Sequence, residues 1–313
     1  MKAIIILIKQ YQQQYFDWKL YLSILVFLMI TTTINFYLDF EDNYIDPYDG
    51  TWWKGLWMFL FHAFPFLTIC GLLYITGKNR QWLHSREFWL KVLVAFGVLG
   101  LFRSFQGYGF LLEGMDGVDV NFLTRPLHRI SGLLTVVFPI TLFYLYWEKD
   151  KSIRYYGLTL SQFDPKPYLT LLAIVAVFIS IGSFEAGLQR FYPFYKGSGG
   201  DAFAQHHQVS ELVSVFIYEL GYGINFIYVE YIFRGFLVLA FARILGGYAV
   251  LAMVGAYMFL HYGKPLAEAI SSVFGAYILG IISLHTRKIW GGVIIHVGVA
   301  WLMELLGYLQ ARL

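Results

Sequence analysis

Charged residues are scarce in this chain. Of its 313 residues only 14% are Asp, Glu, Lys or Arg, whereas 58% are hydrophobic. A soluble domain carries roughly 25% charged residues because its whole surface meets water. This chain has too little polar surface to cover itself, so a water-soluble globular fold is excluded and part of its surface is expected to face lipid.

Cysteine is nearly absent as well, since Cys70 is the only one. A disulfide framework and a cysteine metal cage are therefore excluded. Basic blocks are missing, and the formal net charge is only +3, which excludes a nucleic-acid partner of the usual basic kind. The lipid bilayer is the partner that the composition predicts.

Long apolar runs are what the chain has in abundance. A helix needs about 20 mostly apolar residues to span a bilayer, and runs of this length do not fit the alternating strands of a membrane barrel. We predict an all-α, polytopic transmembrane helix bundle of about nine spans, or eight to ten because the sixth run is long. The predicted spans cover residues 21–39, 56–76, 89–106, 129–147, 168–185, 211–240, 247–263, 266–285 and 289–309.

The chain divides into two membrane halves. Residues 1–153 are predicted to hold about four spans, and residues 168–313 a C-terminal bundle with most of the ionisable residues that fall within predicted spans. The mixed segment 154–167, which contains two prolines, is predicted to be an interfacial cytoplasmic linker. Lys and Arg are more frequent in the connections that lie on the same side of the membrane as the N-terminus than in those on the opposite side. The N-terminus is therefore predicted to be cytoplasmic.

Four ionisable residues within the predicted C-terminal spans stand out: Glu230, Arg234, His261 and His296. Such groups are costly in a bilayer, so each one is a functional-site hypothesis, although an ion pair or a helix–helix hydrogen bond is the structural alternative. Glu230 and Arg234 are four residues apart and are predicted to pair on one helix face. A turn at Gly246–Gly247 would bring His261 to the depth of Glu230, whereas His296 is predicted to lie nearer the cytoplasm.

A Glu and two His that converge in a low-dielectric cavity indicate water activation. Glu230 could remove a proton from water as a general base, and an imidazole could stabilise the oxyanion of an attacked carbonyl. The alternative is a zinc ion held by His261, His296 and Glu230, for which no HExxH motif is present; no other cofactor is predicted. The glycines beside His296 predict a close helix approach; they are Gly291, Gly292 and Gly298.

These residues form a pattern over positions 211–309 that resembles the CPBP family of intramembrane proteases, also called CAAX proteases or Abi proteins. The family motif Glu-Glu-x-x-x-Arg is matched by VEYIFRG, with Glu230 and Arg234. The motif Phe-x-x-x-His is matched by YMFLH with His261, and the motif His-x-x-x-Asn/Asp by HVGVA with His296.

Three positions depart from the family pattern: Val229 replaces the first Glu, Tyr257 the Phe, and Ala300 the Asn or Asp. In the family the first Glu is commonly assigned as the water-activating base. The resemblance therefore implies that Glu230 or a carboxylate from another helix takes over this role. Glu268 is the best substitute, because a short turn could face it back onto His261.

Two further carboxylates are predicted to be interfacial. Glu219 lies on the face of Glu230 but ~16 Å away along the axis, and Glu304 lies off the face of His296 by about 80°.

The resemblance implies an intramembrane endopeptidase that hydrolyses a peptide bond of a membrane-embedded or lipid-anchored substrate, with Glu230, Arg234, His261, His296 and Glu268 as candidate catalytic residues. It also implies a bacterial plasma (inner) membrane. Val229 and Ala300 support an alternative, a catalytically inactive member that acts as a membrane binding or chaperone-like protein. A proton-coupled transporter is a third hypothesis, which no broken-helix pair in the sequence supports.

Overall fold

The computed structural model describes residues 2–310, which form helices and turns and contain no strand. Several helices begin at a side-chain cap; Asp17 and Ser85, for example, accept hydrogen bonds from Leu20 N and Phe88 N. The helices of the N-terminal half are α1 (Lys2–Tyr15), α2 (Trp18–Leu38), α3 (Trp52–Ile75), α4 (Arg86–Ser104), α5 (Gly117–Gly132) and α6 (Phe138–Tyr146). Those of the C-terminal half are α7 (Lys166–Gly182), α8 (Ala186–Phe191), α9 (Gly200–His206), α10 (Glu211–Glu230), the π-helix η8 (Tyr231–Ala240), α11 (Ala242–Leu245), α12 (Ala249–Phe259), α13 (Leu266–Thr286) and α14 (Trp290–Gln310).

The predicted all-helical membrane bundle is confirmed. Within the described residues, seven helical segments are long and apolar enough to cross a membrane, and the pair formed by α7 and residues 186–206, bent by 92°, makes an eighth. One of the seven, Glu211–Phe259, contains the turn at Gly246–Gly247, after which α12 packs back along η8. Dividing it there gives the predicted sixth and seventh spans.

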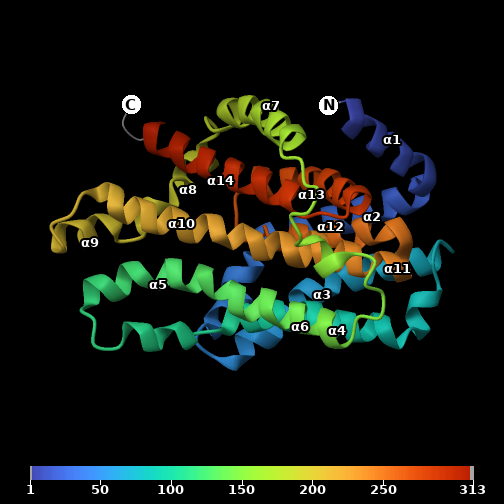
Figure 1. Cartoon of the computed structure of the whole chain (residues 1–313), viewed down its shortest axis with the longest axis horizontal. Coiled ribbons are helices and arrows are strands. Elements are labelled where there is room, and N and C mark those ends of the chain that lie inside the picture. The colour runs from blue at the N-terminus through green and yellow to red at the C-terminus, as the bar shows by residue number, and fades with distance from the viewer. Residues whose placement is uncertain (1, 311–313) are drawn as a thin grey trace.

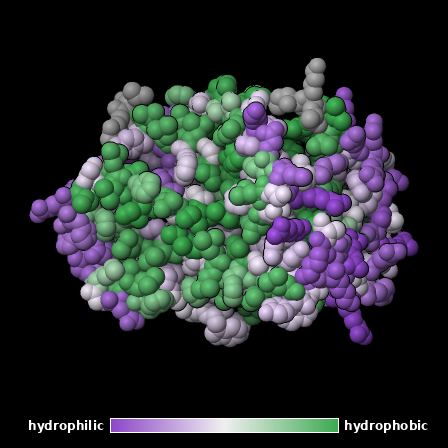
Figure 2. Space-filling model, in the orientation of Figure 1, coloured by the Kyte–Doolittle hydropathy of each residue, from purple (hydrophilic) through white to green (hydrophobic). Residues whose placement is uncertain are grey.

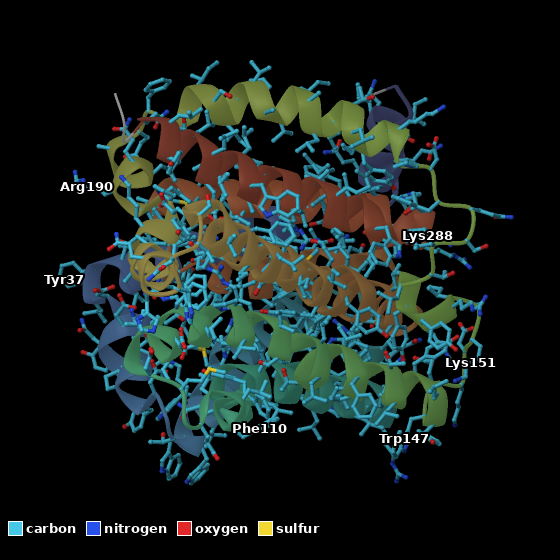
Figure 3. All side chains as sticks on the ribbon, turned by 60° about the vertical axis from the view of Figure 1, so that its left-hand side comes forward. Tyr37, Phe110, Trp147, Lys151, Arg190 and Lys288 are labelled. Atoms are coloured by element: carbon cyan, nitrogen blue, oxygen red, sulfur yellow. The ribbon has the colours of Figure 1, made fainter. Side chains whose placement is uncertain are left out.

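The long helices run roughly parallel to one axis of the molecule (Figure 1). Figure 2 shows a broad apolar band across the middle and hydrophilic side chains at both ends. Large apolar side chains such as Met29, Phe178 and Phe274 are exposed on the surface of the bundle, as is expected of a surface that faces lipid. Figure 3 places Trp147, Lys151 and Lys288 at one end of the bundle, and Tyr37 and Arg190 at the other. The chain is an integral membrane protein.

The centre of the bundle is formed by η8 and α12. Every residue of both helices is buried, and α3 and α13 pack around them. The segments that contain the first two sequence motifs are thus the most enclosed part of the molecule.

The predicted linker enters the bundle rather than lying only at its surface. Tyr156 is 2% exposed, and its carbonyl oxygen lies against Gly235 of η8. Ile289 N donates to Gly157 O (3.2 Å), and Trp290 Nε1 donates to Leu158 O (2.8 Å). These bonds fix the start of α14 at the depth of Gly235, well inside the bundle.

A buried ionic cluster holds this segment in place. Lys91 Nζ lies 2.9 Å from Glu148 and donates to Ala240 O (2.8 Å), and the Tyr156 hydroxyl donates to Glu148 (2.8 Å). Burial acts to raise the pKa of Glu148, but the Lys91 ammonium and the Tyr156 hydroxyl outweigh it and hold this pKa below its ordinary value. The carboxylate is therefore charged at neutral pH and joins α4, η8 and the inserted segment.

Candidate functional site

The predicted pair of Glu230 and Arg234 is present at the junction of α10 and η8. Arg234 Nη1 lies 2.9 Å from Glu230 Oε1, and both side chains are completely buried. A buried charge is tolerated only when a partner neutralises it. The two residues therefore form a neutral unit inside the membrane bundle.

His296 of α14 completes the carboxylate environment. Its Nδ1 lies 2.5 Å from Glu230 Oε1, so the prediction that His296 lies nearer the cytoplasm than Glu230 is wrong. The reason is the depth of α14: it begins level with Gly235, and the seven residues from Ile289 to His296 rise only ~10 Å.

Gly292 makes this contact possible. It lies one turn before His296, and a Cβ atom at this position would overlap Glu230 Oε2. Side chains at Gly291 and Gly298 would likewise overlap Tyr168 and Leu172 of α7. The close helix approach predicted from these glycines is therefore present on two faces of α14.

Tyr257 links the other members of the cluster. Its hydroxyl lies 2.7 Å from His296 Nε2, and its ring centroid lies 4.3 Å from Arg234 Cζ in a cation–π contact. Glu230, Arg234, Tyr257 and His296 thus form a closed ring of contacts. The tyrosine hydroxyl was missed by the sequence reasoning; its signal was the replacement of the family Phe by Tyr.

His261 joins the cluster through Tyr257. Its ring lies 4.7 Å from the Tyr257 ring, and its Nδ1 is 2.9 Å from Tyr257 O. A carbonyl oxygen can only accept, so Nδ1 carries the proton and Nε2 of the neutral imidazole has a lone pair. This Nε2 makes no hydrogen bond to any residue between positions 2 and 310, which makes His261 a proton acceptor without a bound donor.

Several polar atoms of the cluster lack hydrogen-bond partners. Among the described residues, Glu230 Oε2 and the Arg234 nitrogens Nε and Nη2 are buried without one. Buried polar groups are nearly always satisfied, so such atoms are candidates for contact with a ligand or water. His296 is more exposed than Glu230 and Arg234, since 18% of its side chain is accessible and theirs are completely buried.

Glu268 is held elsewhere. Its carboxylate pairs with Lys264 and accepts a hydrogen bond from the Tyr192 hydroxyl (3.1 Å). The expected approach of Glu268 to His261 is not found among the contacts of residues 2–310. The reason is that the segment before α9 inserts Tyr192 beside the start of α13 and binds the carboxylate there.

Glu304 and Glu219 also differ from the expected interfacial carboxylates. Glu304 is 6% exposed and accepts hydrogen bonds from Phe194 N (2.8 Å) and Tyr195 N (3.2 Å), so it anchors the segment after α8. Glu219 is half-buried, and its Oε2 is enclosed. Both line a groove of about 770 Å³ between α10 and α14.

The two apolar replacements of the family motifs lie in packed surroundings. Val229 is 8% and Ala300 5% exposed. Ala300 belongs to an apolar cluster with Tyr222 and Phe226, and the Phe226 ring stacks on His296 at 5.5 Å. At position 300, where the family pattern has Asn or Asp, this chain therefore has a small apolar residue packed against aromatic rings.

Among residues 2–310 no three His, Cys, Asp or Glu side chains converge on one point that could hold a metal ion. The zinc alternative required Glu230, His261 and His296 to do so. Both nitrogens of His296 are already hydrogen-bonded, and Nδ1 of His261 faces a carbonyl oxygen, so this donor set does not fit a zinc site.

The fold and the cluster define an integral membrane protein with a buried carboxylate–imidazole centre. Residues 203–302 match the family model described as Rce1-like, type II CAAX prenyl endopeptidase Rce1-like. The resemblance predicted from the motifs is confirmed for this region, which contains Glu230, Arg234, His261 and His296. No match was found among the curated proteins or among the solved structures.

The geometry predicts that Gly292→Ala disturbs the centre. The added methyl group overlaps the Glu230 carboxylate, and overpacking of this kind costs about 1–3 kcal/mol. We expect a lower Tm in detergent. Gly275→Ala is the matched control, because a Cβ atom at Gly275 of α13 meets nothing within 4 Å. Equal Tm values for the two variants would contradict the tight contact at Gly292.

Proposed function

We propose that this chain is an intramembrane endopeptidase that hydrolyses a peptide bond of a membrane-embedded or lipid-anchored substrate. The observation that carries the proposal is the 2.5 Å contact between Glu230 Oε1 and His296 Nδ1 inside a membrane bundle. Ionisable groups at such depth are retained for function. The match of residues 203–302 to a CAAX prenyl endopeptidase family gives independent support.

The proposed base is the Glu230–His296 pair. The carboxylate accepts the Nδ1 proton and fixes the imidazole with Nε2 as the proton acceptor, as an acidic residue does for a catalytic histidine. A water molecule that replaces the Tyr257 hydroxyl at Nε2 loses a proton there, and its oxygen adds to the carbonyl carbon of the peptide. The lone pair of His261 Nε2 accepts the second hydrogen of the same water and orients it.

The proposed oxyanion donors are the Tyr257 hydroxyl and the N–H groups at Nε and Nη2 of Arg234, which lack partners among the described residues. Donors fixed in a water-excluded site stabilise the developing charge strongly. The proton on His296 then passes to the leaving nitrogen as the C–N bond breaks, so a carboxylic acid and an amine are released and the imidazole is neutral again.

The groove between α10 and α14 supports a substrate with a lipid-soluble part. Phe216, Leu220, Trp301 and Leu305 line it together with Glu219. It lies on the same two helices as Glu230 and His296. An apolar anchor in this groove would bring the attached peptide toward the centre.

The first test is cleavage of a lipid-anchored peptide by the purified protein in detergent. Glu230→Gln and His261→Ala are expected to lower the rate by about 10²–10⁴-fold, because each removes part of the proton-transfer machinery. Glu113→Gln is the control, because Glu113 is an exposed glutamate outside both the centre and the groove, and it is expected to cleave normally.

Wild-type rates in folded Glu230→Gln and His261→Ala would overturn the assignment. If the wild type is inactive and Val229→Glu cleaves, the chain is instead an inactive family member that binds membrane peptides. The burial of Val229 and Ala300 among apolar side chains favours this second candidate over a transporter.

A second test separates the hydroxyl of Tyr257 from its ring. Tyr257→Phe keeps the ring beside Arg234 but removes the proposed oxyanion donor, which is worth about 10²–10³-fold in kcat. We expect kcat to fall with little change in Tm. An unchanged or higher kcat would show that the hydroxyl only occupies His296 Nε2 and takes no part in catalysis.

We also propose that the N-terminus is cytoplasmic, in what the family resemblance implies is a bacterial plasma membrane. Lys151 and Lys288 lie at one end of the bundle (Figure 3), which supports assignment of this end to the cytoplasm. In a Cys70→Ser background, Arg190→Cys should react with an impermeant maleimide on whole cells, and Lys151→Cys only after permeabilisation. The reverse pattern would invert the topology.

A further inference from the structure

A second polar cavity lies away from the Glu230 centre, where α3 begins, α4 ends and α5 enters the bundle. Its volume is about 520 Å³. Lys54 of α3, Arg103 of α4, and Arg125 and Arg129 of α5 line it. The proposed protease chemistry uses none of these residues.

Two of the four cations are neutralised by carboxylates. Lys54 pairs with Asp46 and lies 2.9 Å from Asp49, and both aspartates also line the cavity. Arg103 Nη2 lies 2.8 Å from Glu41. The positive charge that is left comes from α5.

Arg125 and Arg129 form no ion pair with a carboxylate of residues 2–310. They are four residues apart on α5, a spacing at which like charges repel each other. Arg129 Nη2 donates to the Tyr218 hydroxyl (2.9 Å), but its Nη1 is buried without an acceptor. Nδ1 of the adjacent His128, which also lines the cavity, is buried without a partner too. The cavity thus has two arginines without an ion-pair partner, a formal excess of one positive charge over Asp46, Asp49 and Glu41, and two enclosed polar atoms that lack partners.

The cavity lies at the level where lipid headgroups meet the protein. Lys54 is the third residue of α3 and Arg103 the last but one of α4, while the chain after Arg129 becomes apolar as it continues into α6. The exposed rings of Trp52 and Trp53 flank the start of α3, and tryptophan is enriched at this interface.

We propose that this cavity binds a phosphate group, with Arg125 and Arg129 as its donors, and that the phosphate belongs to a lipid headgroup. The planar guanidinium group fits phosphate oxygens in a bidentate manner. An anion between the two side chains relieves their repulsion and supplies acceptors for Arg129 Nη1. Free phosphate has the same chemistry and is the other source of such a ligand.

The test measures the Tm of the delipidated full-length protein in detergent with three probes: dioctanoyl phosphatidylglycerol, inorganic phosphate and dioctanoylglycerol. A ligand that binds only the folded state raises Tm in a concentration-dependent way. We expect phosphatidylglycerol to raise it and dioctanoylglycerol, which has no phosphate, to have no effect. Inorganic phosphate should compete with the lipid.

Arg125→Gln and Arg129→Gln are each expected to weaken lipid binding by about 10- to 100-fold, the value of a hydrogen bond to a charged group. Arg190→Gln is the control, because Arg190 is an exposed arginine at the same end of the bundle (Figure 3). Arg129 packs on Tyr218 and Tyr222, and its replacement could therefore unfold the protein. In that case the lipid binding of Arg125→Gln alone tests the site.

Unchanged lipid binding in Arg125→Gln would overturn the site. Equal shifts with dioctanoylglycerol would overturn the recognition of phosphate. A shift with inorganic phosphate but none with the lipid would keep the phosphate site and reject the headgroup as its source.

Discussion

The Glu230 carboxylate is the constraint on which the C-terminal half depends. It is completely buried, so its charge must be matched inside the bundle. Arg234 supplies the opposite charge from the same helix, and His296 supplies a hydrogen-bonding nitrogen from α14. The contact with His296 could not form if α14 lay a side chain farther away, which is why position 292 is glycine. Packing and electrostatics therefore select the same helix spacing.

The depth of α14 depends on residues far away in the sequence. Lys91 of α4 and Glu148 hold Tyr156 in the bundle. The carbonyl oxygen of the neighbouring Gly157 accepts a hydrogen bond from the backbone N–H of Ile289, the residue just before α14. A segment between the two membrane halves thus sets the level of His296. The N-terminal half therefore supports the centre through this segment.

Local patterns in the sequence predicted most of the fold and half of the site. Apolar runs locate helices because lipid imposes a length on each span, and the four-residue spacing of Glu230 and Arg234 determines their pairing. The position of His296 could not be predicted in this way, since a span was assumed to begin at the membrane surface. Glu268 and Glu304 were misjudged for a related reason: their partners, Tyr192 and the amides after Pro193, come from a bent segment whose docking no local pattern encodes.

The replacement of the family glutamate by Val229 changes the charge of the centre. A second carboxylate beside Glu230 would face a single arginine and leave a net negative charge in a buried site, where an unmatched charge is costly. With Val229 the cluster holds one carboxylate, one guanidinium group and two imidazoles, so it is neutral when both histidines are neutral. Glu230 Oε1 is shared by Arg234 and His296, and Oε2 is enclosed against Gly292. The lone pair at Nε2 of His261, and that at Nε2 of His296 once water displaces the Tyr257 hydroxyl, are then the basic positions for water. In the proposed mechanism the charge balance therefore favours an imidazole as the base.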